Sequence, residues 1–161
     1  MIALRPVRPE DREFLLSVYA STRTDELAVV PWGEAEKAAF LRQQFDAQTA
    51  YWDEQYPGAE RLIAEIDGQP AGRLYVQRWP KEIRLVDIAL LPAFRRRGAG
   101  TELIQRLFSE AAGRGTPVTI HVEIFNPARA LYERLGFAPK GEQGMYVLME
   151  WKPEAVGAGV S

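Results

Sequence analysis

The chain of 161 residues is 47% hydrophobic and 26% charged, which predicts one soluble globular domain over residues 1–152 and a flexible tail over 153–161. A formal net charge of −2 argues against nucleic acid or an anionic membrane as the main partner. The absence of Cys excludes disulfides and thiolate chemistry. Because there is also only one His, we expect no bound metal. We also expect a cytoplasmic location, because no apolar stretch is typical of a signal peptide or approaches a membrane-spanning length.

The N-terminal half is predicted to begin with a strand and two helices, followed by a β-hairpin. Apolar periodicity and turn residues place these elements as a strand over 2–7, a helix from Pro9 to about Thr22, a loop over 24–32, a helical region over 33–56, a strand over 61–66, a turn over 67–70 and a strand over 72–79.

The C-terminal half is predicted to contain a strand–helix–strand unit. Its elements are a strand over 83–91, a helix over 101–114, a strand over 117–124, a helix over 127–135 and a final strand over 145–151. The first of these strands is apolar on both faces from Leu85 onward, which is typical of a buried central strand. Because a helix connects them, the strands over 83–91 and 117–124 should be parallel.

The most informative stretch is Arg95-Arg96-Arg97-Gly98-Ala99-Gly100, between that central strand and the helix that follows. Its two glycines allow a tight turn and a close approach of the backbone to a ligand. The first amides of a helix have no internal acceptors and favour an anion, and the three arginines add positive charge. The stretch therefore predicts a phosphate or diphosphate site, although a basic turn that merely opens a surface helix is the alternative.

Two well-known phosphate loops do not fit this stretch. It lacks the Gly-Lys-Ser/Thr of a P-loop, and Leu103 occupies the third glycine position of a dinucleotide fingerprint. What it resembles is the acyl-CoA diphosphate loop of the GNAT acetyltransferase superfamily, Arg/Gln-x-x-Gly-x-Gly/Ala. Arg95, Gly98 and Gly100 fill the three defined positions, whereas Arg96 stands where the family normally has Gly.

A second segment, Asn126 to Phe137, can be interpreted from its residues alone as a short amphipathic helix. Asn126 suits the N-cap, Pro127 the first helical position and Gly136 the C-terminal cap. The segment also resembles the second GNAT signature, Asn-x-x-Ala-x-x-Leu-Tyr-x-x-x-Gly-Phe, shortened by one residue between Asn126 and Tyr132. The two signatures occur in the family's order and together cover residues 83–137.

The resemblance implies an α/β GNAT fold. This fold has a mixed, mostly antiparallel, twisted sheet of six to seven strands and about four helices, with a parallel pair that splays apart at the acyl-CoA cleft. It also implies an N-acetyltransferase with acetyl-CoA as co-substrate. The residues that would contact acetyl-CoA are Ile88, Ala89, Leu90, Arg95, Arg96, Arg97, Gly98, Ala99, Gly100, Thr101, Asn126 and Tyr132.

The implied reaction is direct attack of a primary amine on the thioester carbonyl, and it needs a proton donor for the departing thiolate. The family often uses the Tyr at the position of Tyr132. A phenol with a pKa of about 10 matches a thiolate of similar basicity. The alternative is that Tyr132 only fills the apolar stripe of its helix. A non-catalytic acyl-CoA-binding or regulatory module on the same fold, and a phosphate-binding turn in an unrelated α/β protein, are the competing functions.

The general base has three candidates. Asp87 interrupts an apolar strand, where an unpaired carboxylate is costly, so it either acts in catalysis or pairs with Arg84 or Arg73. His121 and Glu123 share the face of their strand opposite its apolar residues. A neutral imidazole near pKa 6.5 could accept the amine's proton, although both side chains could equally form a solvated face.

The acceptor amine is not defined by the sequence. By resemblance, its site would be built from about 24–56 and 141–146, where acidic and aromatic residues would suit a cationic small molecule or a peptide amine. A homodimer through a sheet edge or the last strand, as in relatives, is left open.

Overall fold

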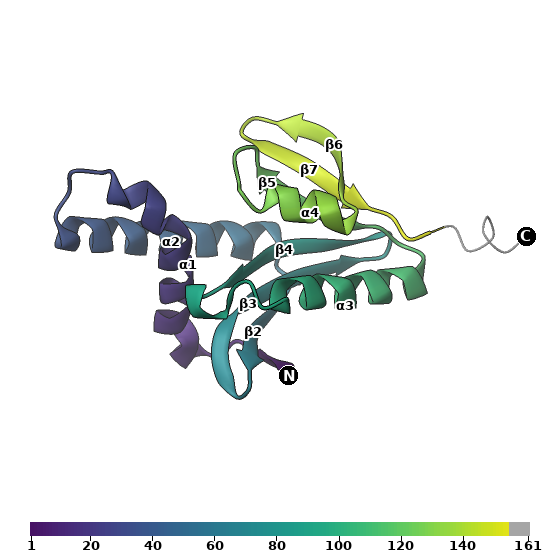
Figure 1. Ribbon diagram of the computed structural model, residues 1–161, viewed down its shortest axis with the longest axis horizontal. Coiled ribbons are helices and arrows are strands. Elements are labelled where there is room, and N and C mark those ends of the chain that lie inside the picture. Colours follow the sequence, from purple (N-terminus) through teal and green to yellow (C-terminus); the bar gives the residue numbers. More distant parts are fainter. Residues whose placement is uncertain (155–161) are drawn as a thin grey trace, which may run out of the picture. The chain divides into compact units, whose positions relative to one another are not determined.

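A computed structural model describes residues 1–154, and Figure 1 shows the course of the chain. Its elements are β1 (Ile2–Pro6), η1 (Pro9–Asp11), α1 (Arg12–Ala28), α2 (Glu34–Gln55), β2 (Glu60–Ile66), β3 (Gln69–Trp79), β4 (Glu82–Leu90), η2 (Pro92–Phe94), α3 (Ala99–Arg114), β5 (Val118–Glu123), α4 (Arg129–Leu135), β6 (Ala138–Gln143) and β7 (Tyr146–Trp151).

The strands form one hydrogen-bonded sheet in the order β1-β2-β3-β4-β5-β7-β6. β4 and β5 are parallel, with Ile83 to Leu85 opposite Val118 to Ile120, whereas β5 with β7 and β6 with β7 are antiparallel. The expected mixed sheet with a parallel pair across a helical connection is therefore confirmed. Its seven strands and four α-helices, counted over residues 1–154, agree with the expected numbers.

The chain divides into two compact units, and β3 and β4 run through both. The first unit contains residues 1–75 and 88–99. Its core lies where α1 and α2 meet β2, with Leu15, Tyr19, Phe45 and Ile63 all nearly inaccessible to solvent. The rings of Tyr19 and Phe45 lie 6.0 Å apart, so the two helices are joined by aromatic as well as aliphatic contacts.

The second unit contains residues 76–87 and 100–161, of which 155–161 lie outside the described part. An aromatic cluster joins its helices to the last strand. Phe108 of α3 stacks on Trp151 of β7, with ring centroids 4.0 Å apart, and contacts Phe137 at 5.4 Å. Gly136 ends α4 with φ at 111°, and an added Cβ would lie 3.0 Å from the Trp151 ring, so both conformation and space require glycine there.

The N-terminal half differs from the sequence expectations at two boundaries. The first helix continues to Ala28, so the predicted loop over 24–32 is wrong in its first part. No Gly or Pro interrupts this stretch, Arg23 pairs with Glu26 one turn later, and Leu27 is buried. The hairpin turn is shorter than expected. Asp67 and Gly68 alone have left-handed backbone angles, and β3 already begins at Gln69.

The C-terminal half differs in three places. β6 was not predicted, because its sequence contains Pro and Gly and every residue in it is exposed. α4 begins at Arg129 rather than Pro127. Val86 to Leu90 are only half-buried, so the later part of β4 is not the fully buried strand that its apolar sequence predicted. Most of the expected tail lies outside the described residues.

Candidate active site

The turn between β4 and α3 has the backbone that its glycines suggested. Arg96 and Gly98 both have positive φ, 64° and 79°, and α3 begins at the next residue, Ala99. A positive φ is uncommon for a residue with a long side chain, so Arg96 is a conformational outlier. The two left-handed residues thus lie directly before the first turn of α3.

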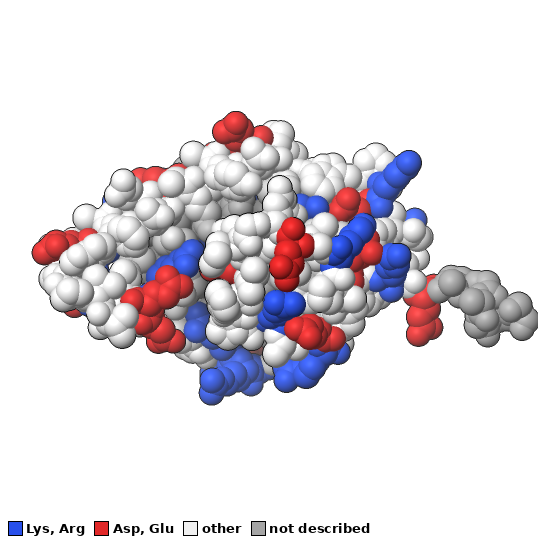
Figure 2. Space-filling view, turned by 90° about the horizontal axis from the view of Figure 1, so that it is seen from above, with Lys and Arg blue, Asp and Glu red and all other residues white. Residues whose placement is uncertain are grey.

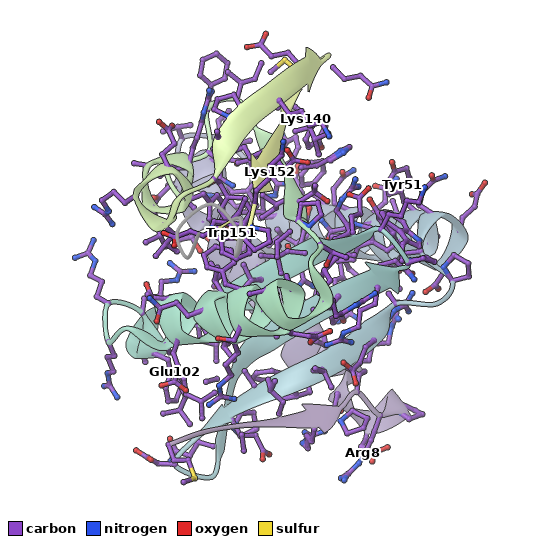
Figure 3. All side chains as sticks on the ribbon, turned by 90° about the vertical axis from the view of Figure 1, so that its right-hand side faces the viewer. Arg8, Tyr51, Glu102, Lys140, Trp151 and Lys152 are labelled. Carbon is purple, nitrogen blue, oxygen red and sulfur yellow. The ribbon has the colours of Figure 1, made fainter. Side chains whose placement is uncertain are left out.

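The start of α3 offers unpaired backbone donors. By the geometry of an α-helix, the N–H groups of Ala99, Gly100 and Thr101 have no acceptor within the helix. Around Gly98 there is open space, because a Cβ added there would have no heavy atom within 4 Å. Glu102, in the same first turn, projects outward (Figure 3) and its carboxylate pairs with Arg106. The turn and the first amides of α3 therefore fit a diphosphate.

The three arginines of the turn differ in their contacts. Arg95 donates through Nε to the Leu90 carbonyl at 2.8 Å and through Nη2 to the Ser21 hydroxyl at 3.2 Å. The guanidinium of Arg97 lies 5.8 Å from the centroid of the Phe94 ring. Arg95 thus fastens the turn to the end of β4 and to α1, and this role is not visible from the sequence.

The end of β4, with Ile88, Ala89 and Leu90, contacts β3 very closely. A Cβ added at Gly72 would lie 2.2 Å from the Ala89 carbonyl oxygen and 2.9 Å from the Leu90 Cα. The Leu91 amide donates to the Ala71 carbonyl at 2.8 Å. Gly72 is thus required by the close approach of the backbone at Ala89 and Leu90, two of the three strand residues that were expected to contact the pantetheine arm.

Tyr132 lies on α4 and is 6% exposed. Burial raises the pKa of its phenol above the usual value, and the negative charge of Asp87 raises it further. Its ring contacts Phe137 edge to face at 5.9 Å. Tyr132 is therefore protonated at neutral pH. Tyr132 is a weaker acid than the unperturbed phenol expected from the sequence, because burial disfavours the charged phenolate.

Asn126 closes the turn that precedes α4. Its side-chain Oδ1 accepts a hydrogen bond from the Ala128 amide at 2.8 Å, and its backbone carbonyl accepts one from Arg129 at 3.0 Å. The side-chain oxygen is used in this turn, so the Nδ2 group is the part of Asn126 left to donate to a ligand carbonyl.

His121 and Glu123 lie on β5, opposite Leu148 and Tyr146 of β7. The pKa of His121 is below its usual value, first because of partial burial and then because of the positive charge of Arg84, while Glu82 acts in the opposite direction. The imidazole is thus neutral at pH 7 and able to accept a proton.

A shallow cavity of about 400 Å³ lies beside the imidazole of His121. Its lining comes from β5, β6 and β7 and consists of His121, Gly141, Glu142, Gln143, Tyr146 and Leu148. The cavity thus includes His121 and much of the segment 141–146 that the resemblance suggested for the acceptor.

A polar network next to His121 was not anticipated. Arg84 donates through Nε to the Thr119 hydroxyl at 2.7 Å, and this hydroxyl also contacts the Glu82 carboxylate. Thr119 is only 2% exposed. The only sequence signal for this polar network was that Thr119 and His121 alternate onto the same face of their strand. The network holds Arg84 in place, and the charges of Arg84 and Glu82 act on the pKa of His121 in opposite directions.

Comparison with known proteins identifies the family of this chain. The Acetyltransferase (GNAT) family matches residues 21–137, and the chain belongs to this family. A search of curated proteins found no match.

Solved structures of the same fold extend over almost the whole chain. The PaiA N-acetyltransferase from Thermoplasma acidophilum, solved with coenzyme A, has a TM-score of 0.70 at 18% identity, over 94% of this chain and 99% of the other. The ribosomal-protein-S18-alanine N-acetyltransferase from Escherichia coli has a TM-score of 0.61 at 21% identity, over 100% and 99%. An acetyltransferase from Thermus thermophilus has a TM-score of 0.66 at 22% identity, over 94% and 97%. At these identities the likeness establishes the GNAT fold.

Figure 2 shows side chains of both charges on the face in view. Within residues 1–154, no helix is both long and apolar enough to cross a membrane, and no group of His, Asp and Glu is arranged to hold a metal ion.

Proposed function

We propose that this protein is an N-acetyltransferase that moves an acetyl group from acetyl-CoA to a primary amine within a ternary complex. The observation that carries the proposal is the turn before α3. It combines the left-handed Gly98, open space around its Cα and the first amides of α3, within residues 21–137 of a GNAT family match. The coenzyme A in the related Thermoplasma structure supports the same kind of donor.

The donor diphosphate would be held by backbone N–H groups from Gly98 to Thr101, because these groups need an anionic acceptor and the helix dipole favours one. Arg96 and Arg97 are exposed in the same turn and add positive charge. The backbone of Ile88, Ala89 and Leu90 and the Nδ2 group of Asn126 are the proposed contacts of the pantetheine arm. An amide-bearing ligand satisfies such groups in the way that an added strand does.

The amine must first lose a proton, since an alkylammonium with a pKa of about 10.4 is only about one part in 2,500 neutral at pH 7. His121 is the proposed acceptor of this proton, directly or through Glu123 or water, because its imidazole is neutral and borders the cavity on the β5–β7 surface. The negative charge of Asp87 raises the pKa of Tyr132, so we assign Asp87 an electrostatic role.

In the chemical step, the amine nitrogen forms a bond to the thioester carbonyl carbon and the carbon–sulfur bond breaks, with its electron pair on sulfur. Tyr132 is the proposed donor to that sulfur. Because burial raises its pKa, complete transfer to a thiolate is uphill, and a hydrogen bond to the developing negative charge provides most of the stabilisation. The nitrogen then loses its remaining extra proton to solvent and the sulfur takes up a proton, from solvent or through Tyr132, so the products are the acetylated amine and the thiol of coenzyme A.

Turnover with a panel of amines tests the proposal. Purified protein is incubated with acetyl-CoA and primary amines that include polyamines, amino acid amides and short peptides, and thiol release is followed together with the mass of each amine. At least one amine should gain an acetyl group at a rate above hydrolysis, and Tyr132→Phe should slow that rate. Binding of acetyl-CoA without turnover of any amine would instead support a non-catalytic module.

A further inference from the structure

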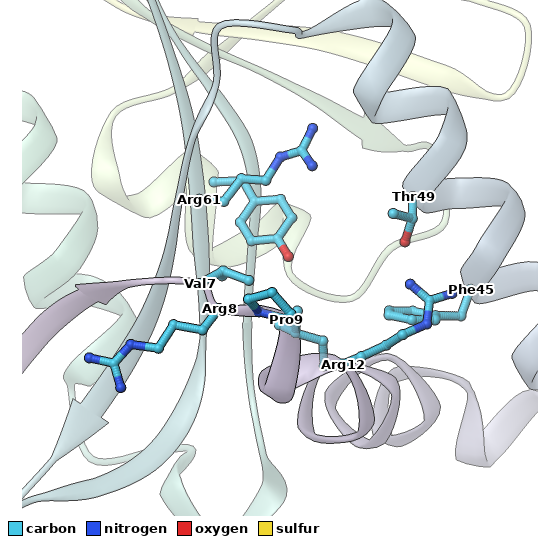
Figure 4. Close-up of a pocket in the computed structure, with 9 residues that line it drawn as sticks. Val7, Arg8, Pro9, Arg12, Phe45, Thr49 and Arg61 are labelled. Atoms are coloured by element: carbon cyan, nitrogen blue, oxygen red, sulfur yellow. The ribbon is translucent and has the colours of Figure 1, made fainter.

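A cavity of about 460 Å³ in the first unit shares no residue with the proposed acetyl-CoA contacts or the catalytic candidates, although Phe45 and Thr49 fall within the segment 24–56 that the resemblance suggested for the acceptor. It is lined by α1 and the segment before it, by α2, and by β2 and β3 (Figure 4), through Val7, Arg8, Pro9, Arg12, Leu15, Phe45, Thr49, Arg61 and Tyr75. A volume of this size is within the range of small-molecule sites in proteins, about 300–1,000 Å³.

The floor of this cavity is apolar and well ordered. Leu15, Phe45 and Tyr75 are between 3% and 7% exposed, so the packing around them is fixed. Tyr75 is further held by edge-to-face contact with Trp52 at 5.5 Å and by the guanidinium of Arg73 at 5.5 Å. Such a floor accommodates an aromatic ring or a branched aliphatic group.

The wall of the cavity is cationic. Its nine lining residues include three arginines and no carboxylate. Figure 4 shows the Arg12 side chain reaching toward Phe45 and Thr49, whereas that of Arg8 points to the opposite side. The Arg12 guanidinium lies 5.3 Å from the Phe45 ring centroid, and that of Arg61 lies 5.8 Å from the Tyr75 ring centroid. Both cations are thus held beside the apolar floor.

Each of these two arginines already has one carboxylate partner. Arg12 pairs with Asp46 and Arg61 pairs with Asp53, and neither Asp lines the cavity. A guanidinium carries five N–H donors, so a single contact leaves donors for a second anion. Thr49 adds a hydroxyl to the same wall.

From these features we infer that the cavity binds a small organic carboxylate with a ring-sized apolar group, whose ring lies against the apolar floor and whose carboxylate contacts Arg12. The ligand would join α1 to α2 and β2, and it would therefore also stabilise the first unit against unfolding. The proposal does not depend on acetyl transfer, because it uses none of the proposed acetyl-CoA contacts or catalytic residues.

Calorimetric titration of the full chain with benzoate, at low ionic strength, tests this site. Benzyl alcohol serves as the neutral analogue and inorganic phosphate as the anion without a ring. Benzoate should bind saturably and raise the melting temperature, and the other two should bind at least about tenfold more weakly, because each lacks one of the two interactions. Equal binding of benzyl alcohol, equal binding of phosphate, or no response to benzoate would each overturn the proposal.

The chain offers a matched pair of arginine variants. The side chains of Arg12 and Arg42 are both 52% exposed and both are paired with a carboxylate, but only Arg12 lines the cavity. Arg12→Gln should weaken benzoate binding roughly tenfold, whereas Arg42→Gln should leave it unchanged. An equal effect of the two substitutions would show that the binding is a general charge effect and would contradict the site.

A second pair of variants tests the cavity without changing charge. Thr49→Phe places a ring in the space and should abolish benzoate binding, while Gln44→Phe, at an exposed position of α2 outside the cavity, should not. Circular dichroism confirms that each variant is folded, and coenzyme A binding should be the same in all of them. Unchanged benzoate binding by a folded Thr49→Phe protein would refute the assignment.

Discussion

Gly98 and Gly115 allow the proposed diphosphate site in the turn before α3 to be tested with a control at the other end of the same helix. They flank α3 at its two ends, have positive φ of 79° and 68°, and in both cases an added Cβ would meet nothing within 4 Å. Alanine at either position therefore tests backbone conformation without a steric clash. Only Gly98 lies in the proposed diphosphate turn.

The expected loss of stability is similar for the two substitutions. A left-handed conformation costs an L-residue about 1–2 kcal/mol, and the lower entropy of the unfolded alanine chain returns about 0.4–1 kcal/mol. The net change in the free energy of unfolding is about 1 kcal/mol, which corresponds to about 2–4 °C in melting temperature for a chain of this size. Differential scanning calorimetry should find Gly98→Ala and Gly115→Ala equal within that range.

The two substitutions should differ in affinity for coenzyme A. A methyl group at position 98 enters the space that the diphosphate would occupy, and losing one or two hydrogen bonds to a charged group costs about 1.5–3 kcal/mol each. We therefore expect Gly98→Ala to bind at least about tenfold more weakly by calorimetric titration, and Gly115→Ala to bind like wild type. If both proteins have the same dissociation constant, the diphosphate is not held by this turn.

Four further predictions follow from other contacts. Tyr132→Phe should lower kcat by roughly 10²-fold in steady-state assays, while the dissociation constant for acetyl-CoA changes little. A loss of acetyl-CoA affinity as large as the loss of kcat would instead indicate a packing role for Tyr132. Wild-type activity should show no loss from phenol ionisation up to pH 10, since burial raises the pKa of Tyr132. The wild-type kcat/KM should stay level from pH 8 to about 6.5 and fall below it, because the pKa of His121 is lowered, and His121→Gln should remove this limb. Arg95→Ala should raise the KM for the amine more than Arg96→Ala does, because only Arg95 contacts α1, and equal KM values would refute that link. The ion pair with Arg5 lowers the pKa of Asp11 to about 2, so ionised Asp11 should contribute about 1–2 kcal/mol to the free energy of unfolding above pH 4 and lose this contribution toward pH 2. Asp11→Asn should flatten that part of a curve of unfolding free energy against pH.

Local sequence signals predicted the glycine-containing turns, although α1 ends later and α4 begins later than expected. The two glycines that close α4 and open the turn before α3 were recognisable because positive φ strongly favours glycine. Gly136 and Gly98 both have the expected conformation, and the Asp67-Gly68 turn is where the sequence placed it. The parallel relation of β4 and β5 followed from the helix that connects them.

Features that depend on tertiary contacts were not predictable in the same way. β6 has no apolar alternation, and its strand conformation comes from pairing with β7. The contact of Arg95 with Ser21 joins residues 74 positions apart. The raised pKa of Tyr132 depends on burial within the second unit and on Asp87, and neither is visible in the helical pattern of α4.

The most direct measurement for the whole account is calorimetric titration of the wild-type protein with acetyl-CoA at two salt concentrations. Because the donor's diphosphate is proposed to lie on helix amides beside arginines, we predict one saturable site whose affinity falls as salt increases. The absence of any heat of binding at millimolar acetyl-CoA would contradict the account, and so would an affinity that does not respond to salt.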